Sequence, residues 1–159
     1  MSAPFTCSIP VRFADVDHAG IVYYPRFFHY FHVAFEELWR TRLGARAYVK
    51  LLDEDRVGFP AVRAECDYTA PLRFGDTADV ELSVERLGRS SITFRYRVWR
   101  AAEPESERSE DDHARARERL LVASGRTICA VVDLARFVAI PAPERIAALL
   151  ADLVEPGAS

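Results

Sequence analysis

The sequence predicts a single α+β domain in which a curled antiparallel sheet wraps around one long central helix. Three observations support this prediction. Residues 25–43 carry apolar side chains at helical spacing around most of the helix, leaving a narrow polar stripe, so the helix must be enclosed on several sides. After residue 60 the apolar period switches to two, and alternating segments follow one another across turns, as in an antiparallel meander. The length of 159 residues suits one core, so one domain over residues 1–159 is expected.

The ends of the central helix are marked by residues that begin and end helices. Pro25 suits the first helical position, where a missing N–H costs nothing, so Tyr24 is the expected N-cap residue. Gly44 is the expected C-terminal stop. The loop before the helix, Asp15-Val-Asp17-His-Ala-Gly20, brings two carboxylates close to the positive end of the helix dipole. We therefore expect chemistry at this junction.

The remaining elements follow from the same periodicities. Alternation predicts strands at residues 9–13, 61–69, 80–84 and 92–98, and a strand at residues 120–134 that is buried on both faces near its end. A shorter helix is expected at residues 45–55, and a final amphipathic helix from Pro141 or Pro143 to Leu153. Residues 102–118 contain no large apolar side chain, so a flexible loop outside the core is expected there.

Composition narrows the classes of function. A net charge of −3 and a hydrophobic fraction of 50% argue against disorder and against general attraction to nucleic acid. No run of about 18 apolar residues and no basic segment followed by an apolar one occurs, so we expect a cytoplasmic protein without a membrane partner. Cys7, Cys66 and Cys129 are widely spaced and lack a CxxC pair, which favours buried free thiols over disulfides or a zinc site.

Three stretches form a recognisable pattern: the stretch from Phe13 to Pro25, the turn Leu87-Gly-Arg-Ser-Ser91, and the late-strand segment Gly125-Arg-Thr127. In these stretches the chain resembles hotdog-fold thioesterases of the 4-hydroxybenzoyl-CoA thioesterase type and their bacterial acyl-CoA thioesterase relatives. The first is highly specific because its aspartate, glycine and aromatic helix start occur together at the family's spacing. The resemblance implies the hotdog fold over nearly the whole chain.

The resemblance also implies roles for three residues of the first stretch. Asp17 is the implied catalytic carboxylate, Gly20 lets the backbone pass close to the acyl group, and the Tyr24 amide binds the thioester oxygen. These roles agree with the physical chemistry of acyl transfer, since a fixed N–H at a helix N-terminus stabilises an oxyanion. A nearby carboxylate can attack the carbonyl or activate water.

The function implied by the resemblance is hydrolysis of an acyl-CoA, without a cofactor, to the free acid and CoA. The aromatic residues around the loop favour an aromatic acyl group, and relatives of this kind are homodimers or homotetramers with active sites at subunit interfaces. One alternative is hydration or dehydration of an acyl thioester on the same fold. Another is a non-catalytic acyl-CoA-binding module.

Other charged residues have more than one interpretation. After the Gly88 turn, Arg89, Ser90 and Ser91 supply charge and hydrogen bonds that suit the phosphates of CoA, and an ordinary hairpin turn explains them equally well. Arg126 is a weaker candidate for the same role. Glu36 and Glu37 on the central helix are alternative bases, although solvated carboxylates are the better interpretation.

The Asp15-Val-Asp17 spacing also suggests a calcium loop, but the ligand set is incomplete. Ala19 stands where a third oxygen ligand is required, and Arg26 occupies the position of the bidentate glutamate. We therefore expect no metal. Asp15 is expected to orient the loop or to pair with an arginine.

Overall fold

The fold is that of a computed structural model, which describes residues 2–107 and 118–157. Its elements follow in this order: β1 (Phe5–Pro10), η1 (Phe13–Asp15), α1 (Pro25–Leu43), α2 (Ala45–Asp53), β2 (Val57–Gly58), β3 (Ala61–Tyr68), β4 (Thr77–Leu87), β5 (Ser91–Arg100), η2 (Glu105–Glu107), β6 (Leu120–Ala130), β7 (Val132–Asp133), β8 (Val138–Ala139), α3 (Glu144–Leu150) and η4 (Ala151–Leu153).

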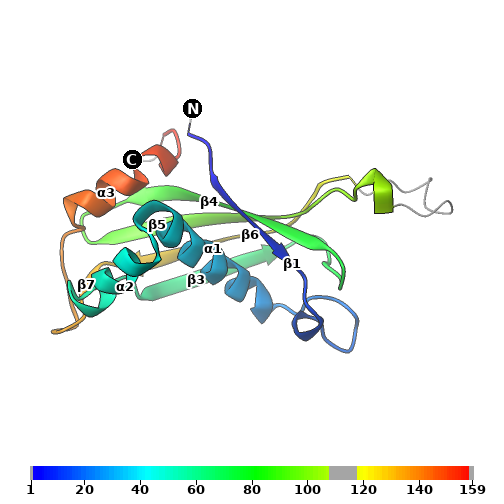
Figure 1. Cartoon of the computed structure of the whole chain (residues 1–159), viewed down its shortest axis with the longest axis horizontal. Helices are drawn as coiled ribbons and strands as arrows, with labels where there is room; N and C mark the ends of the chain where they lie inside the picture. The colour runs from blue at the N-terminus through cyan, green and yellow to red at the C-terminus, as the bar shows by residue number, and fades with distance from the viewer. Residues whose placement is uncertain (1, 108–117, 158–159) are drawn as a thin grey trace.

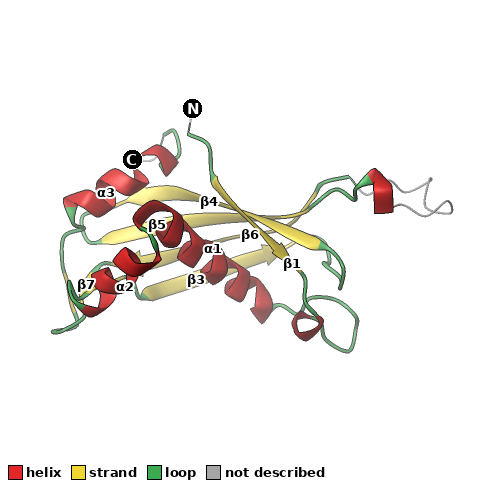
Figure 2. Cartoon of the chain, viewed as in Figure 1, coloured by secondary structure: helices red, strands yellow, loops and turns green. Residues whose placement is uncertain are grey.

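A five-stranded antiparallel sheet in the order β1-β4-β5-β6-β3 forms the body of the domain, and β2, β7 and β8 form a smaller sheet. The helix α1 lies across one face of the large sheet (Figure 1). Figure 2 shows how the long strands extend past both ends of this helix. The predicted architecture, a curled antiparallel sheet around one long helix, is confirmed. The strand β3 lies at an edge of the sheet, with one side unpaired.

The helix α1 packs closely on the sheet because one strand residue lacks a side chain. Phe31 is buried and stacks on Tyr96 of β5, with ring centroids 4.4 Å apart. A Cβ atom at Gly125 would lie 2.6 Å from the Phe31 ring and 2.5 Å from the carbonyl oxygen of Glu65. Any side chain there would push α1 or β3 away from β6, which gives the Gly125 position of the sequence motif a packing role.

The predicted ends of the helices are largely confirmed. The helix α1 begins at Pro25 with Tyr24 as N-cap and ends at Leu43 with Gly44 as C-cap. The helix α2 follows directly at Ala45–Asp53, inside the predicted range of residues 45–55, and is more exposed than α1. The last helix has Pro143 as its N-cap, which selects Pro143 over Pro141 as its start.

Two strand predictions are wrong in their bounds. The first strand ends at Pro10, and Phe13 lies in a 3₁₀ turn with 79% of its surface exposed. That turn forms because the amide of Asp15 donates to the Arg12 carbonyl while the Asp15 carboxylate accepts from the Arg12 amide. The strand predicted for residues 120–134 is interrupted at Val131, where the chain leaves the large sheet and joins the small one as β7.

The predicted flexible loop at residues 102–118 lies largely outside the described residues; its described part contains the 3₁₀ turn η2. Cys129 is buried, whereas Cys7 and Cys66 are only half-buried, and all three are free thiols. Within residues 2–107 and 118–157, no helix is long and apolar enough to cross a membrane.

Candidate functional site

The loop before α1 holds Asp17 in a tight turn. The Asp17 amide donates to the Ile21 carbonyl at 3.0 Å, and the Gly20 amide donates to the Asp17 carbonyl at 2.9 Å. Gly20 has φ of 80°, a conformation that other residues adopt at a cost, so glycine suits this turn. One carboxylate oxygen of Asp17, Oδ1, accepts from the Ala19 amide at 2.8 Å. No group in the described part of the chain bonds the other oxygen, Oδ2, which is available for chemistry.

Tyr24 presents its backbone at the start of α1, beside this loop. Its amide donates to no group among residues 2–107 and 118–157, because the amides at the start of a helix have no preceding helical carbonyl to bond. Its carbonyl oxygen accepts from the Tyr68 hydroxyl at 3.0 Å, which fixes the orientation of the peptide that follows. A free N–H at a helix N-terminus is the kind of group that stabilises an oxyanion.

Asp17 and Tyr24 line the same cavity, which has a volume of about 630 Å³ and which we call the loop cavity. Phe27 of α1 and Tyr68 of β3 form its aromatic wall, with ring centroids 5.1 Å apart. Arg73 is the cation among its lining residues. The structure therefore places a carboxylate and a free amide in one mainly apolar space.

The buried carboxylate of Asp15 holds the loop in place through hydrogen bonds. It is 2% exposed and accepts from Arg26 Nη2 at 2.5 Å, from the Tyr30 hydroxyl at 3.0 Å and from the Arg12 amide at 2.8 Å. Burial alone would raise the pKa of Asp15, but the bonds from Arg12, Arg26 and Tyr30 outweigh it and hold the pKa below its ordinary value. The predicted pairing of Asp15 with an arginine is confirmed, and Asp15 is an ionised anchor rather than a base.

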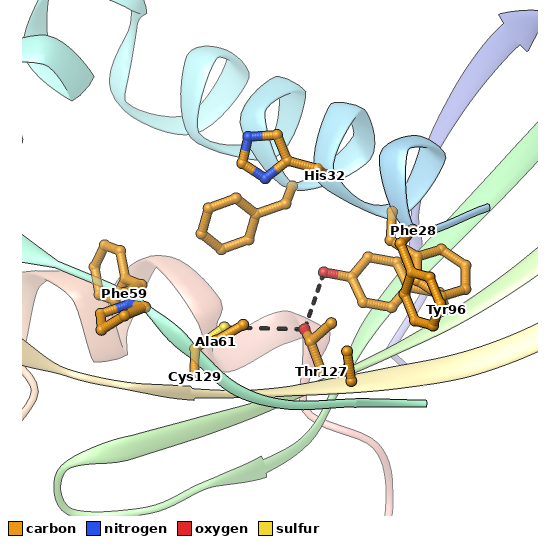
Figure 3. A pocket seen from close by; sticks show the side chains of 11 residues that line it. Phe28, His32, Phe59, Ala61, Tyr96, Thr127 and Cys129 are labelled. Atoms are coloured by element: carbon orange, nitrogen blue, oxygen red, sulfur yellow. Dashed lines mark hydrogen bonds between the residues drawn. The ribbon is translucent and has the colours of Figure 1, made fainter. Parts of the chain in front are cut away.

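A second cavity, of about 390 Å³, lies between α1 and β3 (Figure 3), and we call it the helix cavity. Its walls are the aromatic rings of Phe28, Phe31, Phe35 and Phe59. Sequence reasoning missed it, because aromatic residues at helical spacing are assigned to a core before they are assigned to a pocket. The excess of rings around α1 was the signal that could have indicated it.

The candidate CoA patch lies far from Asp17 within one chain. Arg89 and Ser90 occupy the β4–β5 turn, which the Gly88 amide closes by donating to the Ser91 carbonyl at 2.9 Å. Arg89 is exposed and has no ion-pair partner among the described residues. The turn and the Asp17 loop lie at opposite ends of the sheet in Figure 1.

The strand register gives the size of this separation. Ser91 pairs with Ala130 of β6, whereas Tyr68, beside the Asp17 loop, pairs with Ala123 of the same strand. Seven residues of strand separate these positions, which corresponds to about 23 Å. The structure therefore brings Asp17, Gly20 and Tyr24 together and leaves Arg89, Ser90 and Ser91 apart from them.

The remaining charged residues considered for a role in the site, Glu36, Glu37 and Arg126, are bonded to other side chains. Glu36 lies 2.9 Å from His32, and Glu37 accepts from Arg40 at 2.7 Å, both on the surface of α1. Arg126 pairs with Glu65 and with Glu85 on the strands of the large sheet. Among residues 2–107 and 118–157, no three His, Cys, Asp or Glu side chains gather as a metal site would require.

Comparison with known proteins places this chain in a family. Residues 19–107 match the Thioesterase superfamily, which is more than half of the chain. A 1,4-dihydroxy-2-naphthoyl-CoA hydrolase from Synechococcus elongatus is 34% identical over 94 residues, 59% of this chain and 68% of the relative. A putative esterase from Aquifex aeolicus is 34% identical over 99 residues, 61% of this chain and 73% of the relative.

Solved structures show the same fold over almost the whole chain. A hypothetical protein from Aquifex aeolicus is 27% identical with a TM-score of 0.74, covering 92% of this chain and 99% of that protein. A 4-hydroxybenzoyl-CoA thioesterase, solved as a complex with 4-hydroxybenzoyl-CoA, is 21% identical with a TM-score of 0.74, over 91% and 96% of the two chains. The chain has the hotdog fold and belongs to the thioesterase superfamily.

Proposed function

We propose that this chain is an acyl-CoA thioesterase that hydrolyses an acyl-CoA to the free acid and CoA. The observation that carries the proposal is the loop cavity, in which a carboxylate with an unbonded oxygen and an unbonded helix-start amide share one space. The names of its relatives support it, since both the Synechococcus hydrolase and the 4-hydroxybenzoyl-CoA thioesterase act on CoA thioesters.

In the proposed mechanism the thioester oxygen accepts a hydrogen bond from the Tyr24 amide. Negative charge that develops on this oxygen is stabilised by the amide and by the positive end of the α1 dipole. The free Oδ2 of Asp17 either attacks the carbonyl carbon or takes a proton from a water that attacks it. The C–S bond then breaks, and CoA leaves as a thiolate that takes up a proton. When water is the nucleophile this step gives the free acid directly; when Asp17 is the nucleophile, water then hydrolyses the acyl–Asp17 anhydride to the free acid and restores the carboxylate.

The lining of the loop cavity favours an aromatic acyl group. Phe27, Tyr24 and Tyr68 present rings to this space, and rings stack on rings in offset or edge-to-face arrangements. Flat acyl groups gain these contacts without loss of chain entropy, whereas a flexible alkyl chain must be ordered as it binds.

Release of free thiol from matched thioesters tests the function and the acyl preference together. Benzoyl-CoA and hexanoyl-CoA differ mainly in shape and flexibility. We expect hydrolysis of both, with kcat/KM about ten-fold higher for benzoyl-CoA because of ring contacts. Rapid turnover of hexanoyl-CoA beside a flat response to benzoyl-CoA would reverse the proposed preference. Tight binding of both thioesters without turnover would contradict the thioesterase proposal and favour a binding module.

The edge strand β3 supports a homodimer as the working unit. Val62 is 67% exposed, β3 contains no proline, and two of its charged residues, Arg63 and Glu65, pair with each other. Its unpaired backbone groups can extend the sheet by pairing with a second copy of β3 across a two-fold axis.

Such a dimer would complete the site. In an antiparallel β3–β3 pair, the Tyr68 end of one strand lies beside the Ala61 end of the other. The helix cavity and the β4–β5 turn lie at the Ala61 end. The Asp17 of one copy would therefore face the helix cavity and Arg89 of the partner subunit, which resolves the separation within one chain.

A further inference from the structure

A third cavity, of about 500 Å³, lies between β1 and α1, and we call it the β1 groove. It lies at the opposite edge of the large sheet from β3, so a dimer formed through β3 would leave it open. Its α1 wall consists of residues spaced by three or four positions along the helix: Arg26, His29, Tyr30, Val33 and Glu37. From Arg26 to Glu37 this wall is about 16 Å long.

The end of the β1 groove next to Asp15 is basic. Arg26 bonds Asp15 through Nε and Nη2, and its Nη1 donates to no group in the described part of the chain. Arg12 also lines this end; it is exposed and has no ion-pair partner among residues 2–107 and 118–157. Asp15 is ionised, because its pKa lies below the ordinary value, so its charge cancels that of one guanidinium group. One net positive charge therefore remains at this end.

The rest of the β1 groove is first apolar and then acidic. Ile9 of β1 and Val33 of α1 line it, and both are half-buried. Glu37 lines the far end, where its carboxylate accepts from Arg40 at 2.7 Å. Burial and, after it, the charge of Glu37 raise the pKa of Cys7, so these two residues lie close together at this end. The groove thus suits an elongated ligand with one anionic end and an apolar body.

We propose that the β1 groove binds a small organic monocarboxylate, with the ligand carboxylate held by Arg12 and by Nη1 of Arg26. Two guanidinium groups can donate charge-assisted hydrogen bonds to the two carboxylate oxygens. The single net positive charge matches one carboxylate and not a doubly charged phosphate monoester. Glu37 disfavours a second anionic group at the far end, because like charges repel. The volume lies within the range of ligand pockets.

The proposed site is separate from the proposed thioesterase site. Neither Asp17 nor Tyr24 lines the β1 groove, and the α1 residues that line it have no role in the proposed mechanism. The two cavities nevertheless each contain one isoleucine. Ile9 lines the β1 groove and Ile21 lines the loop cavity, so the methyl resonances of these two residues report the two cavities separately.

NMR of the full chain with labelled isoleucine methyl groups tests the inference. The probes are benzoate, its uncharged analogue benzamide, and phenyl phosphate. We expect benzoate to shift the Ile9 resonance in a saturable way, with a Kd about ten-fold lower than that of benzamide, the contribution of a charged hydrogen bond. Phenyl phosphate should bind more weakly than benzoate. Binding of benzoate to the loop cavity, as the product of a thioesterase, would shift Ile21 instead.

Two substitutions change the β1 groove in different ways. Arg12→Gln removes one guanidinium group and should raise the Kd of benzoate about ten-fold, while the backbone amide that bonds Asp15 remains. Val33→Phe fills the apolar middle and should weaken binding by a similar factor. Arg46→Gln is the matched control, because it removes an exposed arginine of α2 outside the groove and should leave Kd unchanged.

The outcomes keep the inference and the proposed function apart. A shift of Ile21 alone would overturn the inference, because benzoate would then bind only the loop cavity. Benzamide or phenyl phosphate that binds as tightly as benzoate, or an Arg12→Gln chain with the wild-type Kd, would overturn it as well. A weaker Ile9 response in both groove variants, with the control unchanged, supports it. Thiol release from benzoyl-CoA measures the proposed function separately, so either proposal can fail alone.

Discussion

Replacing Asp17 with asparagine is expected to lower kcat for thioester hydrolysis by about 10²–10⁴-fold, the contribution of a positioned acid–base group. The amide can neither attack the carbonyl nor accept a proton from water. The fold should persist, because the side-chain oxygen of asparagine can still accept from the Ala19 amide and the residue is exposed. The free energy of unfolding should therefore change by less than about 0.5 kcal/mol.

A control for charge accompanies this measurement. Asp53→Asn removes one negative charge at an exposed position of α2 and should leave kcat unchanged. The assay is the steady-state release of free thiol, with circular dichroism to confirm folding. If Asp17→Asn retains wild-type kcat, Asp17 is not part of the mechanism, and Glu36 or Glu37 becomes the candidate base.

The Asp15→Asn substitution is expected to have the largest effect on stability. It leaves the Arg26 guanidinium without its anion and weakens the bonds from Tyr30 and the Arg12 amide. Removing one partner of a fully buried pair costs about 3–5 kcal/mol; because Arg26 is 29% exposed, we expect the free energy of unfolding to fall by about 2–3 kcal/mol. Urea unfolding at pH 7 measures this loss.

The effect of Asp15 should depend on pH. Its folded-state pKa is lowered, so its contribution to stability is present above the unfolded-state pKa of about 4 and is lost as the pH falls toward the folded-state value. The difference in stability between wild type and Asp15→Asn should be constant from pH 6 to 8 and shrink below about pH 5. A difference that persists unchanged at pH 3 would mean that the ionised carboxylate is not what stabilises the loop.

Much of the fold was predictable because local signals agreed with the tertiary structure. Pro25 and Gly44 mark the ends of α1 by backbone chemistry that no neighbour overrides. The alternation of residues 61–69 reproduces β3, Ala61–Tyr68, within one residue. The shared cavity of Asp17 and Tyr24 was predictable because the turn and the helix start are adjacent in sequence, so the chain itself brings them together.

Other features depend on contacts that the sequence does not specify. Tyr96 fits the apolar alternation of β5, and the sequence did not reveal that its hydroxyl reaches Thr127 on the next strand across a cavity. The early end of β1 follows from the bonds of Asp15, which compete with the strand ladder. The sequence motif indicated that Arg89 binds the CoA phosphates of a substrate that reacts at Asp17. Within one chain, however, the strand register places these two residues at opposite ends of the sheet.

The most direct test of the central claim is the activity of a purified heterodimer of Asp17→Asn and Arg89→Glu chains. The two chains carry different tags, are co-expressed, and are confirmed as dimers by sedimentation. Both homodimers should be nearly inactive at low substrate concentration. The heterodimer should recover about half of the wild-type kcat/KM, because one of its two sites combines an intact Asp17 with an intact Arg89 of the partner subunit. A heterodimer no more active than the homodimers would contradict a site shared between two copies.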